Sequence, residues 1–286
     1  MLRKVVIPAA GLGTRLLPAT KEQPKEMLPV FARGVDGGLC VKPFLQVVFE
    51  KLHEAGFRSF CFVVGRGKRS IEDHFTLDGG FSHRLPRENK AALMRELSAF
   101  YDKITKSHIV FLNQPEPRGF GNAVFHAKGF TGNEPFLVHA GDDLILSEDN
   151  HCMRRLVEVF ESFGADAVFH VQRVGDPRNY GVVAGERVGD NLYRVKRMEE
   201  KPLSPFSNLA AVAVYVFSPR LYDALEEVHV DVNGEVQLTD AIKWMIDEDY
   251  GVYALELGGQ ERRIDIGTPE SYWQVLKTVR EWWLCL

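Results

Sequence analysis

A chain of 286 residues with 45% hydrophobic residues can bury one large core, or two modest ones, without disulfides or structural metals. Its net charge of −4 argues against binding to nucleic acid, and no apolar run approaches the length of a membrane span. Its four cysteines are scattered without a C-x-x-C pair, and the first residues do not resemble a signal peptide, so we expect a cytoplasmic protein.

Strand-like and helix-like segments alternate over the first 172 residues. Short apolar runs predict strands at 4–9, 59–64, 108–113, 135–140 and 166–171. Apolar residues at helical spacing predict helices at 43–55, 69–75, 89–105, 121–128 and 150–163. Strands that alternate with helices form parallel sheets covered by helices on both faces, so we expect a three-layer α/β fold.

The pattern changes after about residue 172. The segments "YGVVAGERVGDNLYRVKRMEEKP" and "LAAVAVYVFS" alternate over shorter lengths, and a Gly-Asp-Asn turn interrupts the first, which favours antiparallel strands. Helical patterns resume at 219–227, 237–247 and 269–284. No linker or internal repeat separates the two parts. We therefore expect one Rossmann-like domain with a mixed, mostly parallel central sheet, in which residues 1–172 and 173–286 each supply half of a site.

Glycines and cations follow the first strand, in "VVIPAAGLGTRLLPATKEQPKEMLP". The segment matches neither a Rossmann fingerprint, because Leu16 stands where the third glycine is required, nor a Walker A loop, because no Gly-Lys-Ser/Thr follows. Ligands of α/β sheets bind beyond the carboxyl ends of the strands, where this loop must lie. Arg15 and Lys25 in the same loop can neutralise a triphosphate, so the sequence favours an anionic ligand here.

Two carboxylates, Asp142 and Asp143, follow the strand predicted at 135–140. They lie at the same carboxyl edge of the sheet as the glycine loop. Mg²⁺ prefers oxygen ligands and keeps several waters beside substrate phosphates. The position and residue type therefore indicate a magnesium site.

The motif "AAGLGTRLLPATKEQPKEMLPV" resembles the G-x-G-T-R…P-K pattern of the sugar-phosphate nucleotidylyltransferases. Its "PATK..PKEMLP" form is similar to that of the bacterial and archaeal UTP:glucose-1-phosphate uridylyltransferases, also called UDP-glucose pyrophosphorylases. The resemblance continues in family order to about residue 275, through "SIEDHF", "GFGNAV", "GDDLIL", "YGVV", "EEKP", "GEVQLTDAI" and "DIGTPESY". Together these blocks are specific for the family.

The resemblance implies a reaction in which the phosphate of glucose 1-phosphate attacks the α-phosphorus of UTP and pyrophosphate leaves. The nucleophile is already an anion, so the chemistry requires no general base. Two polyanions must instead be brought together against roughly 4 kcal/mol of repulsion per pair of unit charges at 4 Å and an effective dielectric of 20. Alignment and charge neutralisation by cations and Mg²⁺ are the expected sources of catalysis.

By the same resemblance, residues 1–172 form the nucleotide-binding half. Arg15 would hold the departing pyrophosphate, and Lys25 would contact the phosphates of the nucleotide or the sugar. Asp142 and Asp265, the latter in "IDIGTP", would hold the metal. The predicted nucleotide-binding residues are Ala9, Ala10, Gly11, Gly13, Gln114, Gly119 and Asp142. The amide of Gln114 has both a donor and an acceptor, which suits the imide edge of uracil.

Residues 173–286 would form the sugar-binding half. Here Gly181, Glu200, Lys201 and Asn208 are the predicted sugar contacts. A carboxylate accepts hydrogen bonds from neighbouring hydroxyls, and Lys201 can bind the attached phosphate as a catalytic cation.

Three alternatives remain open on the sequence. The chain could be a thymidylyltransferase, a uridylyltransferase for another hexose 1-phosphate, or a catalytically silent homologue that binds nucleotide sugars. It also departs from the family in "FARGVDGGLCV", residues 31–41, a longer loop than is usual between "MLPV" and "KPF". The large apolar residues Trp282, Trp283 and Leu284 end the last predicted helix, so we expect a homodimer or homotetramer.

Overall fold

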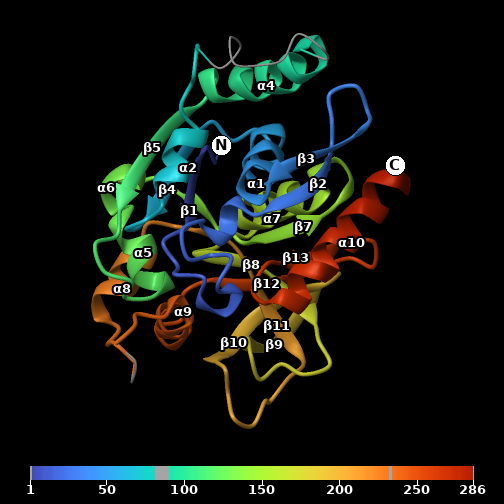
Figure 1. Cartoon of the computed structure of the whole chain (residues 1–286). Helices are drawn as coiled ribbons and strands as arrows, with labels where there is room; N and C mark the ends of the chain where they lie inside the picture. The colour runs from blue at the N-terminus through green and yellow to red at the C-terminus, as the bar shows by residue number, and fades with distance from the viewer. Residues whose placement is uncertain (1, 81–89, 232–233, 286) are drawn as a thin grey trace.

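The computed structural model describes residues 2–80, 90–231 and 234–285, and its centre is a nine-stranded sheet (Figure 1). Within the described residues the spatial order is β5 (His108–Asn113), β4 (Ser59–Val64), β1 (Lys4–Pro8), β6 (Phe136–His139), β11 (Leu209–Phe217), β8 (Ala167–Arg173), β12 (Val252–Glu256), β10 (Leu192–Glu200) and β9 (Gly181–Gly189). Strands β11 and β10 run against the direction of the others. The predicted mixed, mostly parallel sheet is confirmed.

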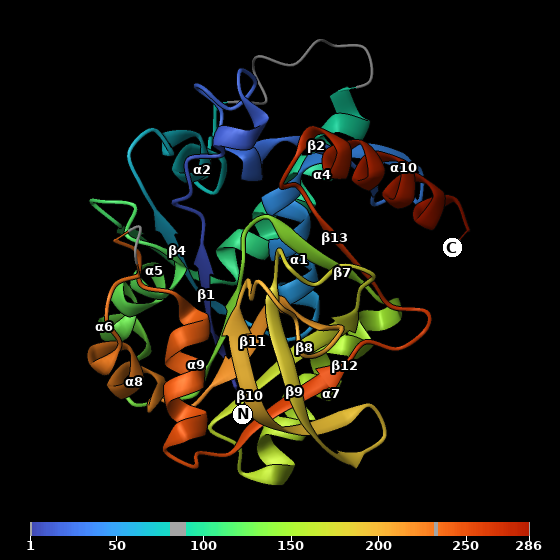
Figure 2. The same cartoon turned by 90° about the horizontal axis from the view of Figure 1, so that it is seen from below.

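Helices cover both faces of the sheet. Residues of α1 (Phe44–Glu54), α2 (Arg69–His74), α4 (Lys90–Thr105), α7 (His151–Phe163) and α10 (Pro269–Cys285) belong to one hydrophobic cluster. Residues of α5 (Phe120–His126), α8 (Leu221–Glu227) and α9 (Leu238–Asp247) belong to the other, and α6 (Lys128–Thr131) packs against it through Phe130. Figure 2 shows α8 and α9 beside α5 and α6, on the side of the sheet away from α10. The three-layer prediction is confirmed.

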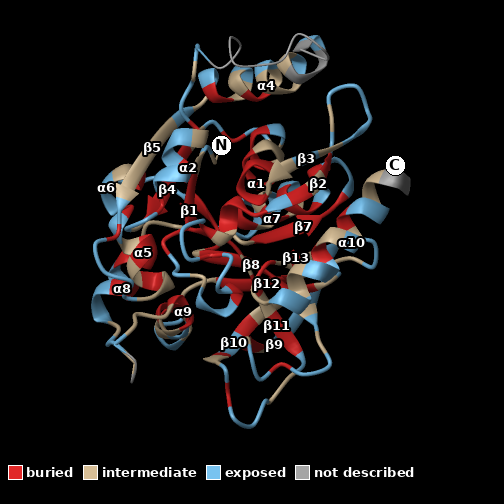
Figure 3. Cartoon of the chain, viewed as in Figure 1, coloured by how far each residue is buried: buried red, intermediate tan, exposed pale blue. Residues whose placement is uncertain are grey.

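Alternate residues of the central strands point to opposite faces. In β1, Val5 and Ile7 belong to one cluster and Val6 to the other, and all three are fully buried. Figure 3 shows this burial as a continuous red core under the helices. Burial on both faces explains why such strands appear in the sequence as uninterrupted apolar runs.

The predicted strand ends agree with the structure to within two residues, and β4 and β5 match their predicted ranges. The helix predicted at 121–128 is two short helices, α5 and α6, on either side of Ala127. Residue 89, the predicted start of another helix, lies outside the described residues.

The prediction of a long loop at 31–41 was wrong. The segment belongs to a hairpin of β2 (Pro29–Arg33) and β3 (Leu39–Pro43), closed by a hydrogen bond of 2.7 Å from the Gly34 N–H to the Gly38 carbonyl oxygen. Two further short strands, β7 (Asp143–Leu146) and β13 (Arg262–Asp265), form a separate antiparallel pair that the sequence did not indicate. This second ribbon matters for the site, because it brings the segment after Asp142 next to Asp265.

The carboxyl ends of β1 and β6 are adjacent, because β1 lies between β4 and β6. The Gly141 N–H donates to the Pro8 carbonyl oxygen at 3.1 Å. A Cβ at Gly141 would lie only 3.2 Å from that oxygen, so the close approach requires glycine. The loop after β1 and the carboxylate after β6 therefore share one edge of the sheet.

Two of the three tryptophans of α10, Trp282 and Trp283, are partly buried against the core of their own chain, while Trp273 is 63% exposed. Trp282 and Trp283 pack on the first cluster, and the Lys51 ammonium lies 5.5 Å from the Trp283 ring centroid. The side chain of Leu284 lies outside the described residues. The apolar surface that motivated the oligomer prediction is thus smaller than the sequence suggested, and the homo-oligomer stays a prediction. None of the helices in the described part of the chain has the length and apolar character needed to cross a bilayer.

Candidate active site

A cavity of about 470 Å³ opens at the carboxyl edge of the sheet. Most of the predicted nucleotide-binding residues line it, together with two of the predicted catalytic cations, Arg15 and Lys25. The nucleotide-binding residues in the lining are Ala10, Gly11, Gly13, Gln114, Gly119 and Asp142. Ala9 is buried and does not line the cavity. Residues separated by more than a hundred positions in the chain thus meet in one hollow.

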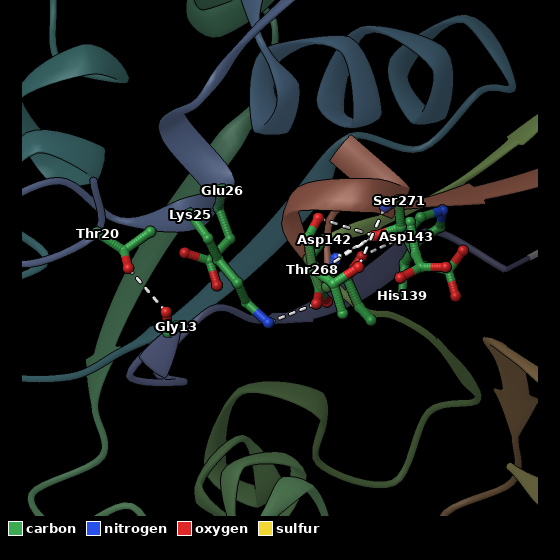
Figure 4. A network of polar contacts seen from close by, with 12 residues as sticks. Gly13, Thr20, Lys25, Glu26, His139, Asp142, Asp143, Thr268 and Ser271 are labelled. Atoms are coloured by element: carbon green, nitrogen blue, oxygen red, sulfur yellow. Dashed lines mark hydrogen bonds and ion pairs between the residues drawn. The ribbon is translucent and has the colours of Figure 1, made fainter. Parts of the chain in front are cut away.

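The glycine loop has a defined conformation. Gly13 adopts a left-handed φ of 66°, which favours glycine, and precedes a short 3-10 helix, Thr14–Leu16. The Thr20 hydroxyl donates to the Gly13 carbonyl oxygen at 2.7 Å, as Figure 4 shows. A Cβ added at Gly11 would lie 3.9 Å from the Lys25 Nζ, so the loop passes directly beside the Lys25 ammonium. The loop therefore places backbone and cation together, as binding of an anion requires.

Lys25 and Asp142 form an ion pair across the cavity (Figure 4). Burial alone would lower the pKa of Lys25, but the carboxylates of Asp142 and Glu26 raise it above its ordinary value. Burial would likewise raise the pKa of Asp142, but the Lys25 ammonium outweighs burial and lowers that pKa. Both groups are therefore charged at neutral pH. The Lys25 ammonium can bind a phosphate, and the Asp142 carboxylate can bind a cation.

A second ion pair lies beneath the first. Glu26 follows Lys25 in the 3-10 helix Lys25–Met27, and its Oε2 lies 2.9 Å from the Lys68 Nζ. Both side chains are almost completely buried, at 2% and 6% exposure. Burial raises the pKa of Glu26, while Lys68 and Lys25 act in the opposite direction. The pair ties the Lys25 turn to the loop between β4 and α2.

Asp143 points away from the cavity into a buried ion pair. The Arg263 Nε donates to its Oδ2 at 2.7 Å, and the Arg263 Nη1 lies 3.6 Å from the Asp265 Oδ1. Burial raises the pKa of Asp143 to about 6, although Arg263 acts to lower it. Arg263 also lies over the Tyr180 ring, with 5.5 Å to the centroid. One guanidinium thus connects the predicted metal carboxylate Asp265 with Tyr180, which directly precedes Gly181 at the start of β9.

The two predicted metal ligands come from neighbouring segments. The Ile266 N–H donates to the Asp142 carbonyl oxygen at 3.1 Å, and Asp265 pairs with Asp143 in the β7–β13 ribbon. Among the described residues, no group of three or more His, Cys, Asp or Glu side chains could hold a metal ion. Two carboxylates completed by water and phosphate oxygens are nevertheless the kind of donor set that Mg²⁺ uses, so these residues fit such an ion.

Gln114 is buried at the end of β5, and its amide is fixed. Its Nε2 donates to the Asn122 Oδ1 at 2.9 Å and to the Gly119 carbonyl oxygen at 3.2 Å. A Cβ at Gly119 would lie 2.7 Å from the Val236 carbonyl oxygen, so this glycine is required by packing against the chain itself. The sequence analysis had predicted Gly119 as a nucleotide-binding residue, where glycine would let the base approach the chain.

The predicted sugar residues lie outside the lining of this cavity, on β9 and β10 and in the segment before β11. Gly181 pairs with Glu200 in the β9–β10 ladder. Lys201 has a left-handed φ of 43°, which is uncommon for a residue with a side chain and frequent at functional sites. Asn208 instead accepts a hydrogen bond of 3.0 Å from Arg173 through its Oδ1.

Several cavity residues escaped the sequence analysis. These are Pro8, Leu12, Thr14, Glu26, Pro117, Phe120, Ala123 and Glu235. Most belong to blocks that carried the family resemblance, so the signal was present in "PKEMLP", "GFGNAV" and "GEVQLTDAI". Apart from that family resemblance, a carboxylate between a lysine and a methionine has no local pattern that distinguishes Glu26 from a surface residue.

The model of the nucleotidyl transferase family matches residues 4–281 of this chain. The chain belongs to this family. A UTP–glucose-1-phosphate uridylyltransferase of Pseudomonas aeruginosa is 36% identical over 278 residues, which cover 95% of this chain and 94% of the relative. One from Bacillus subtilis is 38% identical over 271 residues, which cover 93% and 87%.

Solved structures of the family agree with the fold. A UDP-glucose pyrophosphorylase complexed with UDP-glucose has a TM-score of 0.83 and 31% identity, and the match covers 98% of this chain and 99% of that chain. The UTP-bound UGPase from Acinetobacter baumannii has a TM-score of 0.83 and 29% identity, with 97% and 93% covered. The nucleotidyl transferase fold therefore extends over almost the whole chain.

Proposed function

We propose that this nucleotidyl transferase joins UTP and glucose 1-phosphate to give UDP-glucose and pyrophosphate. The uridylyltransferase relatives and the structures with UTP and UDP-glucose support this activity. The observation that carries it in this chain is the cavity in which Arg15, Lys25 and Asp142 converge at the end of β1 and β6. Residues 1–172 supply the nucleotide part of the site and residues 173–286 the sugar part.

The reaction forms one P–O bond and breaks another. A phosphate oxygen of glucose 1-phosphate attacks the α-phosphorus of UTP, and the bond from that phosphorus to the bridging oxygen of the β-phosphate breaks. The negative charge of the attacking phosphate passes to the pyrophosphate that leaves, so no proton needs to move. Arg15 and Lys25 neutralise the triphosphate, and Lys201 binds the sugar phosphate.

A divalent cation, Mg²⁺, is proposed at Asp142 and Asp265, where it would neutralise the triphosphate further. The chain's own contribution is to keep Asp142 ionised and to hold Asp265 in the neighbouring strand. Lys25 lowers the pKa of Asp142, and Arg263 lies 3.6 Å from Asp265. Because the Gln114 amide N–H groups donate to Asn122 and Gly119, Gln114 would contact uracil through its Oε1, which can accept from the ring N–H. Glu200 would accept hydrogen bonds from sugar hydroxyls.

A coupled assay of pyrophosphate release tests the proposal. The purified chain is given UTP or dTTP with a panel of hexose 1-phosphates, with and without Mg²⁺. We expect turnover with UTP and glucose 1-phosphate, loss of activity in EDTA, and a fall in kcat of about 10²–10³-fold in Lys25→Ala, as for removal of one transition-state contact. Asp142→Asn should abolish the metal-dependent activity.

Lys21→Ala is the matched control, because Lys21 lies in the same loop, is exposed, and does not line the cavity. It should keep the wild-type kcat. Full activity in EDTA would contradict the metal proposal, and a near-normal kcat in Lys25→Ala would remove that lysine from the mechanism. Preference for dTTP or for another hexose would support one of the alternative transferases. No turnover with any pair would support a silent homologue.

A further inference from the structure

Within the described part of the chain, the Glu200 carboxylate has two side-chain partners, Lys201 and Thr239, which are far apart in sequence. The Lys201 Nζ lies 2.9 Å from its Oε1. The hydroxyl of Thr239, in the first turn of α9, donates to its Oε2 at 2.7 Å. Lys201 has 58% of its side chain exposed, whereas Thr239 is 7% exposed. Thr239 is therefore the fixed partner, and Lys201 is free to turn toward a ligand.

Thr239 is itself held in place by the segment that precedes it. The Val236 N–H donates to the Arg118 carbonyl oxygen at 2.8 Å, and the Val236 carbonyl oxygen accepts from the Gly121 N–H at 2.9 Å. A Cβ at Gly121 would lie 2.8 Å from that oxygen, so the two backbone segments are in close contact and glycine is needed there. Residues 235–239, which we call the bridging segment, thus connect the loop before α5 with Glu200.

Gly181 is buried beside the Glu200–Thr239 contact, where a Cβ would lie 3.4 Å from the Glu200 Oε2 and the Thr239 Oγ1 and 3.2 Å from the Met198 Cε, so glycine keeps this contact uncrowded. The Glu200 side chain itself is 25% exposed, so its carboxylate is accessible to a ligand. An ionised carboxylate has about four acceptor positions on its two oxygens. Lys201 and Thr239 occupy one on each oxygen, which leaves acceptor positions for a pair of neighbouring hydroxyls.

We propose that Thr239 is a positioning residue for the sugar phosphate. Its hydroxyl fixes the plane and direction of the Glu200 carboxylate, and so sets which hydroxyl arrangement on the sugar binds best. The inference rests on the proposed function and adds a residue to its sugar site. Without the hydroxyl, the exposed Lys201 is the remaining partner, and the carboxylate follows that mobile side chain.

Two substitutions at this position separate positioning from packing. Thr239→Val keeps the shape and removes the hydroxyl, while Thr239→Ser keeps the hydroxyl and removes a methyl group. A charge-assisted hydrogen bond of this kind corresponds to about a tenfold effect. We expect the KM for glucose 1-phosphate to rise about tenfold in Thr239→Val, with the KM for UTP changed by less than about twofold. Thr239→Ser should restore the KM for glucose 1-phosphate.

The same variants are compared with galactose 1-phosphate, the 4-epimer, and their thermal unfolding is measured. A positioning role predicts that Thr239→Val lowers the ratio of kcat/KM for the glucose over the galactose substrate. A merely structural role predicts that Thr239→Val lowers the unfolding temperature but leaves both the kcat/KM ratio and the KM for glucose 1-phosphate unchanged. This result would overturn the inference. Failure of Thr239→Ser to recover would also overturn it. An inactive wild-type chain would refute the proposed function, and the inference with it. An active wild-type chain whose Thr239 variants show none of these effects would refute the inference alone.

Discussion

Replacing Lys68 by Met should destabilise the protein through the carboxylate that it leaves behind. Glu26 and Lys68 are almost completely buried, and their charged atoms lie 2.9 Å apart. Breaking a buried ion pair by removing one partner costs about 3–5 kcal/mol, because the remaining charge is buried and unpaired. Lys25 also acts to lower the pKa of Glu26 and offsets part of this loss. We therefore expect the free energy of unfolding to fall by about 3 kcal/mol.

The pH dependence of the unfolding free energy gives an independent test of the loss of stability in Lys68→Met. Burial raises the pKa of Glu26 in the folded state, so the folded protein binds this proton more tightly than the unfolded chain. Stability is therefore greater below the unfolded pKa and falls as the pH rises toward the folded pKa. Loss of the Lys68 ammonium raises the folded pKa further. The defect of Lys68→Met should accordingly be smaller at about pH 5 than near neutral pH.

Urea unfolding followed by circular dichroism measures these differences, provided that the slope of the transition is unchanged. Lys68→Met/Glu26→Met, which removes both charges, should recover most of the stability lost in the single variant. Lys196→Met is the control, since its ion pair with Glu186 is exposed and 4.0 Å long, and it should cost less than about 1 kcal/mol. The reasoning is refuted if the double variant is as unstable as Lys68→Met, or if Lys68→Met behaves like the control.

Two further substitutions test the close packing and the buried charge beside the site. Gly121→Ala should lower the free energy of unfolding by about 1–3 kcal/mol, because its Cβ would lie 2.8 Å from the Val236 carbonyl oxygen. Gly129→Ala in α6 has open space and should be neutral or stabilising, and equal urea midpoints for the two variants would contradict the argument. Burial raises the pKa of Asp143 from 3.8 to about 6, so wild-type stability should decrease as the pH rises between these values. Asp143→Asn should remove that part of the stability profile, and an unchanged profile would assign it to another group.

The elements predicted best from the sequence are those that form an apolar run of their own. The strands at 59–64 and 108–113 match their predictions, because each is a short run of mostly apolar residues that can be recognised without knowledge of its neighbours. In β4 this run reflects burial, whereas β5, at the edge of the sheet, is only partly buried. β13 could not be found this way, since Ile264 is its only buried residue and charged side chains surround it. In the β2–β3 hairpin only one face is buried, and the glycines of its turn resemble those of a loop.

The candidate site divides in the same manner. The rule that ligands bind at the carboxyl edge of the sheet placed Arg15, Lys25 and Asp142 in one region, and all three line the cavity. Lys68 and Thr239 were not predicted, because their partners are 42 and 39 positions away in the chain and leave no periodic signal. Pairing between distant residues is decided by tertiary packing, which a single sequence does not display.

Four charges of alternating sign line up beside the cavity: Lys68, Glu26, Lys25 and Asp142. In the proposed reaction a triphosphate approaches Lys25 and a divalent cation approaches Asp142. Lys25 then exchanges the Asp142 carboxylate for the phosphates, and Asp142 exchanges the Lys25 ammonium for the divalent cation. Neither charge is left without an opposite charge beside it. Glu26 keeps Lys68 throughout, because that pair is almost fully buried. The electrostatic field that acts on the polyanions is therefore present before they bind. The Glu26–Lys68 pair holds the Lys25 turn in place when Lys25 and Asp142 separate.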